Sequence, residues 1–118
     1  MTFAELLNAF AASPDNSLTI PTSWAQGRAG YGGLVAALVF AGMRAKVASG
    51  RPVRSLAITF VGPVTPGESM SVEAEVLREG KAVSQVLGRA MQNGQTMCII
   101  QGSFGAGRES VVDVAAEP

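Results

Sequence analysis

The segment from Trp24 to Gly33 is where the backbone of this chain is best suited to do chemistry. It reads Trp-Ala-Gln-Gly-Arg-Ala-Gly-Tyr-Gly-Gly and holds four glycines. Glycines this dense permit tight turns, or they let another molecule approach the backbone closely. An apolar run starting at Leu34 predicts a helix, and the first N–H groups of a helix have no partner inside it and can stabilise negative charge. The segment is therefore either a site for negative charge or a tightly packed turn, and the sequence alone favours neither.

Side chains that usually carry catalysis are scarce. The chain has no histidine, and its single cysteine, Cys98, lies in an apolar run that is typical of a small buried residue in a strand. A nucleophilic cysteine needs a nearby base, and no Asp or Glu occurs between Asp15 and Glu68. This composition argues against a metal site, and the Gly-x-Ser-x-Gly elbow of serine hydrolases is missing. We expect no resident cofactor.

Charge and length narrow the class of protein further. The 118 residues carry nine basic and nine acidic side chains without a long run of one sign, which argues against nucleic acid or an anionic membrane as the main partner. The length predicts a single domain over residues 1–118. A short chain with 47% hydrophobic and only 15% charged residues often hides surface against another subunit, so we expect a homo-oligomer.

The sequence also predicts a soluble protein of the cytoplasm. A single cysteine cannot form an internal disulfide, which fits a reducing compartment. The N-terminus lacks the basic and apolar regions of a signal peptide. The longest apolar run, Leu34–Met43, is about half the roughly 20 residues that a membrane span needs.

Two helices are predicted in the first half of the chain. Thr2 and Glu5 form a capping-box pair ahead of apolar residues at helical spacing, and Ser13-Pro14 ends that helix before a short strand at 18–20. The second helix, Leu34–Ala48, is apolar on nearly every face and therefore belongs in the middle of a core. Gly42 lowers its helix propensity by roughly 1 kcal/mol, and we expect close packing against a sheet there.

The second half of the chain alternates with a period of two, which predicts four consecutive strands joined by tight turns. Glu79-Gly80-Lys81 marks one turn, and Asn93-Gly94 is a strong hairpin signal. The tail, 106–118, reads as a loop or a linker. The predicted strands are 54–60, 70–76, 83–91 and 95–104.

These elements predict an α+β fold in which a curved antiparallel sheet wraps one long central helix. Consecutive strands with tight turns pair antiparallel, and the sheet must bury one face. Only the 34–48 helix is apolar enough to fill that face, which is the hotdog architecture. A cystatin-like or nuclear-transport-factor-like α+β fold stays open from the pattern alone.

Several segments together resemble the N-terminal hotdog half of acyl-CoA thioesterase II-like proteins, and the resemblance covers nearly the whole chain. No single motif decides it, but their order and spacing are specific. The segments are Trp24-x-Gln26-Gly27-Arg28, Tyr31-Gly32-Gly33, Arg54-Ser55-Leu56, Phe60-Val61-Gly62-Pro63-Val64, Leu77-Arg78-Glu79-Gly80-Lys81, Ser84-Gln85, Gln92-Asn93-Gly94 and Ser103-Phe104-Gly105.

The resemblance implies a domain that binds an acyl-CoA thioester, with coenzyme A as part of the substrate. The backbone of Gly32 and Gly33 is then the candidate oxyanion site, and Gln26, Arg28 and Tyr31 are candidate substrate-binding residues. The alternative is that these three side chains only anchor the loop. Family members usually carry two hotdog halves, so either two copies pair or a second half is missing.

The family's catalytic Asp, Thr and Gln belong to the second half, and a rough superposition of halves places Gly33, Val53 and Phe104 of this chain at those positions. None of these can orient a water, so this half resembles the non-catalytic one, and the general base stays unknown. Hydratases and dehydratases of this fold use a histidine, which the chain lacks. Two functions stay open: an acyl-CoA thioesterase active as an assembly, or a catalytically silent module that binds acyl-CoA or builds an interface.

Overall fold

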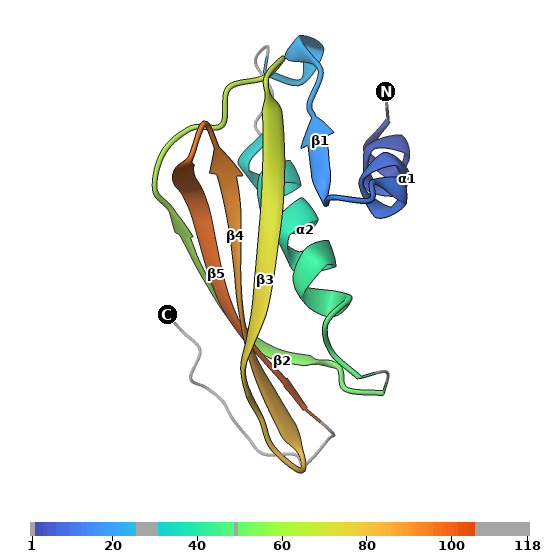
Figure 1. Cartoon of the computed structure of the whole chain (residues 1–118), viewed down its shortest axis with the longest axis vertical. Coiled ribbons are helices and arrows are strands. Elements are labelled where there is room, and N and C mark those ends of the chain that lie inside the picture. Colours follow the sequence, from blue (N-terminus) through green and yellow to red (C-terminus); the bar gives the residue numbers. More distant parts are fainter. Residues whose placement is uncertain (1, 26–30, 49, 106–118) are drawn as a thin grey trace.

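The computed structural model describes residues 2–25, 31–48 and 50–105. A twisted, five-stranded antiparallel sheet carries one long helix, α2, on one face, and the short helix α1 lies beyond it (Figure 1). This confirms the predicted α+β class with a central helix against an antiparallel sheet. The predicted linker, 106–118, lies outside the described residues.

Helix α1 (Phe3–Ala12) begins and ends where the sequence predicts. The Thr2 hydroxyl accepts a hydrogen bond from the Glu5 backbone N–H, and the Glu5 carboxylate accepts one from the Thr2 backbone N–H, which completes the capping box. Leu6 and Phe10 are buried on its inner side. Strand β1 (Ser17–Thr19) and the 3₁₀ helix η1 (Thr22–Ala25) follow.

Helix α2 (Tyr31–Arg44) starts three residues before the predicted Leu34 and ends four residues before the predicted Ala48. The chain leaves the helix through i→i+3 hydrogen bonds, from the Lys46 N–H to the Met43 carbonyl and from the Val47 N–H to the Arg44 carbonyl. Val47 is still buried in this turn. Val47 is apolar because it packs into the core after the helix has ended. The sequence pattern alone cannot distinguish this packing from a longer helix.

The predicted strands all form, and all pair antiparallel. They are β2 (Val53–Phe60), β3 (Ser69–Glu79), β4 (Val83–Gln92) and β5 (Gln95–Gly105). Asn93 and Gly94 both have positive φ, at 54° and 76°, as the two-residue turn between β4 and β5 requires. The β3–β4 turn is closed by a hydrogen bond from the Gly80 N–H to the Val83 carbonyl.

One prediction about the sheet is wrong, namely that a tight turn joins β2 to the next strand. The strand order is β1-β3-β4-β5-β2, so β2 pairs with β5 at the opposite edge from β1 and β3 (Figure 1). Residues 61–68 carry the chain from one part of the sheet to the other. The buried Gln92 side chain fixes this connection, because it accepts from the Thr65 N–H and donates to the carbonyls of Thr65 and Glu68.

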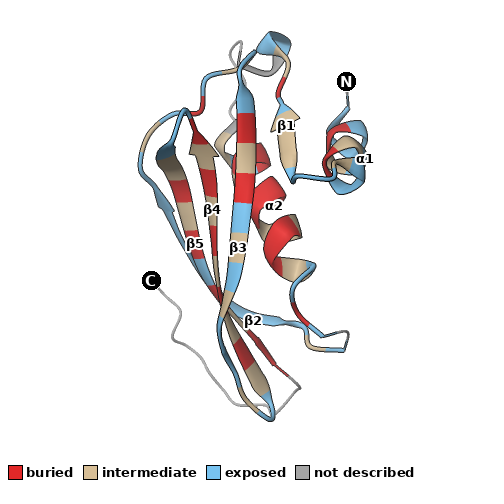
Figure 2. Ribbon diagram, in the orientation of Figure 1, coloured by how far each residue is buried: buried red, intermediate tan, exposed pale blue. Residues whose placement is uncertain are grey.

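The core lies between α2 and the middle of the sheet (Figure 2). Strand β4 alternates between buried and partly exposed residues along its whole length. Cys98 of β5 is 1% exposed, which confirms its prediction as a small buried residue. A Cβ added to Gly42 would lie 2.7 Å from Cγ1 of Val72, so the predicted close packing of this glycine against the sheet is also confirmed.

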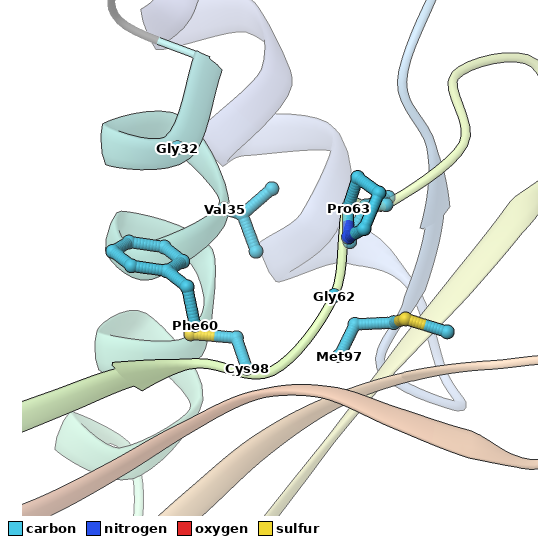
Figure 3. Close-up of a pocket in the computed structure, with 8 residues that line it drawn as sticks. Gly32, Val35, Phe60, Gly62, Pro63, Met97 and Cys98 are labelled. Carbon is cyan, nitrogen blue, oxygen red and sulfur yellow. The ribbon is translucent and has the colours of Figure 1, made fainter.

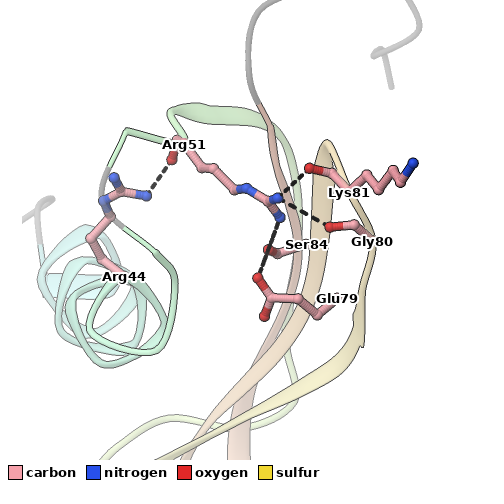
Figure 4. Close-up of polar contacts among 6 residues, drawn as sticks. All are labelled: Arg44, Arg51, Glu79, Gly80, Lys81 and Ser84. Carbon is pink, nitrogen blue, oxygen red and sulfur yellow. Dashed lines mark hydrogen bonds and ion pairs between the residues drawn. The ribbon is translucent and has the colours of Figure 1, made fainter.

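Polar contacts fix the end of α2 to the β3–β4 turn (Figure 4). The Arg51 guanidinium donates to the carbonyls of Gly80 and Lys81 and to the buried Ser84 hydroxyl, and it pairs with Glu79 at 3.3 Å. The Arg44 side chain donates to the Arg51 carbonyl. Among the described residues, no helix has the length and apolar character to cross a membrane.

Strand β2 differs from the rest of the sheet, because all eight of its residues are exposed. Leu56, Ile58 and Phe60 pair with Gly102, Ile100 and Cys98, and directly opposed residues point to the same sheet face. They therefore lie on the face that α2 covers elsewhere. Since α2 contacts mainly β3, β4 and β5, it leaves this part of the face open. The predicted packing of the central helix against the antiparallel sheet is therefore confirmed, and β2 contributes an exposed part of the same sheet face.

Candidate functional site

The predicted site residues fall at the start of α2. Gln26 and Arg28 lie outside the described residues. Tyr31 is the first residue of α2, and Gly32 and Gly33 complete the start of its first turn. The N–H groups of this turn have no hydrogen-bond partner within the helix itself, because the i→i−4 pattern has no earlier carbonyl to offer.

Neither glycine of this turn packs closely against the described residues. A Cβ on Gly33 would have no atom of the described residues within 4 Å, and a Cβ on Gly32 would make only ordinary contact, at 3.6 Å, with the Phe60 ring. Both residues are helical, where glycine is less favourable than alanine by roughly 1 kcal/mol. The described residues therefore offer no close packing that would require glycine at these two positions.

An apolar pocket of about 390 Å³ lies beside this turn (Figure 3). Its buried wall is formed by Val35 of α2, Val64 of the 61–68 connection and Cys98 of β5. Phe60, which is 58% exposed, forms part of the rim. The described residues that line it are Gly32, Val35, Phe60, Gly62, Pro63, Val64, Met97 and Cys98.

The pocket is positioned by hydrogen bonds at the end of β2. The N–H groups of Val61 and Gly62 both donate to the Met97 carbonyl, at 2.8 and 3.1 Å, which fixes the connection against β5. The Gln92 side chain holds the following residues, Thr65 and Glu68. The wall that contains Pro63 and Val64 is therefore anchored at both ends.

The chemistry of the pocket is that of an apolar binding site. Among the described lining residues, Cys98 carries the only ionisable side chain, and burial raises the pKa of its thiol. The thiol therefore stays protonated near neutral pH and is a poor nucleophile. No other described residue of the lining has a side chain that can accept a proton from water.

Two carboxylates that could act as a base lie elsewhere. Glu68 accepts a hydrogen bond from the Asn93 side chain at 3.0 Å, and Glu73 pairs with Arg89 across the β3–β4 ladder at 3.6 Å. Neither lines the pocket.

The three positions matched to the family's catalytic residues do not form one cluster. Val53 and Phe104 are paired across β2 and β5, and the Phe104 ring stacks on Phe40 with centroids 5.8 Å apart. Phe40 follows Gly33 by seven residues, or about 10 Å along the helix. The superposition thus places three residues here that do not form one cluster and that carry no catalytic group.

Sequence reasoning missed most of the pocket. Gly62-Pro63 was interpreted only as a break after a strand, and Cys98 only as core. A usable signal was the apolar stretch Phe60–Val64, which continues past the strand without a polar residue. A connection that crosses the end of a sheet needs such residues when it forms the wall of a cavity.

The structure resembles several solved thioesterases. The acyl-CoA thioesterase II TesB2 from Mycobacterium marinum matches with a TM-score of 0.65 and 23% identity, over 75% of this chain and 35% of that one. A putative thioesterase II from Thermobifida fusca matches with a TM-score of 0.63 and 18% identity, over 86% and 38%. The BH2602 protein from Bacillus halodurans, solved with CoA, matches with a TM-score of 0.52 and 26% identity, over 63% and 53%.

This chain therefore spans about a third to a half of the length of these three structures. Among curated proteins, none matches it. The sequence profile of the acyl-CoA thioesterase N-terminal domain matches residues 20–105, which include α2, the whole pocket and all strands from β2 to β5. The chain belongs to the family of acyl-CoA thioesterase N-terminal domains, which have the hotdog fold.

Proposed function

We propose that this chain binds acyl-CoA and takes part, as an assembly, in its hydrolysis to a free fatty acid and CoA. The observation that carries the proposal is the apolar pocket beside the first turn of α2. Its lining suits an acyl chain, and Gly32 belongs both to the pocket and to the turn. An acyl chain in the pocket would thus bring its thioester next to N–H groups that have no partner within the helix.

The backbone of Gly32 and Gly33 is the proposed oxyanion site. A tetrahedral oxyanion develops negative charge, which helix N-terminal N–H groups stabilise. The open space around Gly33 supports this role, because a carbonyl can reach the backbone there. In known enzymes, one such donor contributes roughly 2.7–4 kcal/mol to the transition state. Gln26, Arg28 and Tyr31 stay proposed contacts for the CoA portion or for water.

The proposed assembly uses the open side of the sheet. Val53, Leu56, Ile58, Phe60 and Val61 are all more than 40% exposed and lie together on and just after β2. Within the described residues, the outer edge of β2 pairs with no other strand. Exposed apolar edges of this kind are sites of association. The partner is either a second copy of this chain or a second hotdog half.

A catalytically silent acyl-CoA-binding module is the second candidate. It is favoured by the lining of the pocket, in which no residue can act as a general base near neutral pH. General acid–base assistance is typically worth about 10²–10⁴-fold. The chain alone should therefore hydrolyse thioesters slowly, and binding should be easier to detect than turnover.

Release of free thiol from acyl-CoA substrates of several lengths tests the two candidates. Polarisation without a positioned base gives a slow rate that rises with pH and has no plateau near neutrality. Gly33→Val should lower this rate at least about tenfold, because its side chain enters the space in front of the helix N–H groups. Ala37→Val is the matched control, since it adds the same side chain one turn later.

Two results of this assay would change the proposal. Fast turnover with a plateau between about pH 5 and 7 would show that a base acts after all, with Glu68 or Glu73 of a partner as the first candidates. A slow rate that Gly33→Val leaves unchanged would make the first turn structural and favour the silent module.

Light scattering at micromolar concentration tests the assembly. Ile58→Lys should dissociate it, since a charge would be buried on the open face of β2. Thr59→Lys is the control, because the neighbouring residue in a strand points to the opposite sheet face. A wild-type chain that stays monomeric over the accessible concentrations contradicts this part of the proposal.

A further inference from the structure

We infer that the pocket limits the acyl group to an unsubstituted hydrocarbon chain of medium length, with Val35 as the residue that sets the limit. This inference rests on the proposed function, since it concerns the substrate of the same site. It adds the class of acyl group and a specificity-determining residue.

The lining selects for a plain hydrocarbon chain. Among the side chains of the eight lining residues, the Cys98 thiol is the only polar group, and it is a weak donor that is 1% exposed. The Met97 carbonyl already accepts from two backbone N–H groups. A hydroxyl or carboxylate at the far end of the chain would find no adequate partner here, and burying such a group without one is unfavourable.

The volume of the pocket sets an upper length. One water takes about 30 Å³ in the liquid, and a methylene group is of similar size. The pocket of about 390 Å³ therefore holds at most about a dozen carbons. Because it is open at the rim near Phe60, the usable length is shorter than a complete filling would give.

Val35 is the side chain best placed to set this limit. It extends from α2 into the space between Phe60 and Pro63 (Figure 3) and is only 3% exposed. A valine in a helix holds one χ1 rotamer about nine times in ten, so its methyl groups form a fixed wall. Val64 and Cys98 close the pocket from the other elements, each at 5% exposure or less.

The affinity should therefore rise with chain length and then stop rising. Each methylene group that enters the pocket should tighten binding about fourfold, which corresponds to about 0.8 kcal/mol. Groups beyond the capacity of the pocket stay at its rim and add little. We expect the break between about eight and twelve carbons, from the volume argument above.

Calorimetric titration of the full chain with S-alkyl-CoA thioethers of 4 to about 16 carbons measures this break without hydrolysis. Val35→Ala should move the break to longer chains by about two carbons, and Val35→Phe should move it to shorter ones. Val64→Ala enlarges the same pocket from the facing wall and should act like Val35→Ala. If Val35→Phe does not fold, Val64→Ala still tests whether the size of the pocket sets the break.

Val39→Ala is the matched control, since Val39 lies one turn later on α2, is fully buried and does not line the pocket. It should lower the melting temperature without moving the break. A thioether with a terminal hydroxyl should bind about tenfold more weakly than its plain counterpart, or weaker still.

The outcomes separate this inference from the proposed function. If thioethers bind but the affinity is independent of chain length, or the break is beyond about 14 carbons, or it stays in place in the Val35 variants, the inference is wrong and the proposed function stands. If no thioether binds, the proposed function is itself wrong.

Discussion

Helix α2 faces two different environments in this chain. On one side, which we call the closed side, β3 and β4 approach so tightly that a Cβ on Gly42 or Gly88 would lie within 2.7 Å of a side-chain atom. On the other, the open side towards β2, the residues of β2 that point to the same sheet face as Ile100 are exposed. The closed side holds the fold together, whereas the open side offers a pocket and an unpaired strand edge.

The two glycines lie in different surroundings within one helix. Gly42 allows close packing of helix on sheet, while a Cβ on Gly33 would meet no described atom within 4 Å. Substitutions on the two sides should therefore separate stability from function, and the following predictions test that separation.

The largest effect is expected for Ile100, which pairs directly with Ile58 across β5 and β2. Ile100 is fully buried and Ile58 is 45% exposed. Ile100→Ala should lower the free energy of unfolding by about 2–5 kcal/mol, and Ile58→Ala by less than about 1.5 kcal/mol in the monomer. Urea unfolding at low protein concentration measures both. Equal losses of unfolding free energy would show that Ile58 on the open side is packed as well as Ile100 in the core.

Substitution of Arg51, which contacts the β3–β4 turn, should lower the stability less than Ile100→Ala does. Its side chain is 16% exposed and donates to two carbonyls and to Ser84. Arg51→Met should destabilise by about 1–3 kcal/mol, since hydrogen bonds from charged groups are lost. Glu79→Gln is the matched change, and it should lose less than about 1 kcal/mol because Glu79 is half exposed. Thermal unfolding that ranks the two variants in the reverse order would contradict this account.

The two helix glycines give the most direct comparison. At Gly42, alanine gains roughly 1 kcal/mol of helix propensity but contacts Val72, and overpacking typically costs about 1–3 kcal/mol. Gly42→Ala should therefore be neutral or destabilise by up to about 2 kcal/mol, whereas Gly33→Ala should be neutral or stabilising. A double-mutant cycle of Gly42→Ala with Val72→Ala should show a favourable coupling, because the second change removes the contact. If no coupling is measured, the sheet accommodates the added methyl group of Gly42→Ala without an energetic cost.

Asp15 lies outside both sides of α2, and its substitution should have the smallest effect on stability. Hydrogen bonds from the Ser17 and Ser13 hydroxyls lower the pKa of its carboxyl group below the ordinary value. A lowered folded-state pKa stabilises the fold above the unfolded-state pKa, and this contribution is lost as the pH falls through the folded-state pKa. Asp15→Asn should therefore lower the melting temperature slightly at pH 7, and the difference from the wild type should disappear as the pH falls below about 4. A difference that stays the same at low pH would contradict this.

Much of the fold follows from local sequence. The capping box at Thr2, the alternation in β4 and the Asn93-Gly94 turn each predict their element, because each signal acts within a few residues. The end of α2 was predicted four residues too late, since Val47 is buried in a turn and buried turns look like buried helices in a sequence.

The site was predictable only in part. Gly32 and Gly33 stand out in the sequence by their density and by the apolar run that follows. The remainder of the pocket brings together residues of α2, the 61–68 connection and β5, which are far apart in the chain. Phe60 and Cys98 meet only because β2 pairs with β5, and the alternating pattern of β2 is compatible with any neighbouring strand.

The sequence by itself determined which segments are helices and strands, because periodicity, caps and turn residues are local. It also determined that few catalytic side chains are available, since composition does not depend on the fold. The tertiary structure decided the position of β2 at the edge, the open side of α2 and the pocket beside Gly32. These depend on which distant strands pair and on how far one helix can cover the sheet.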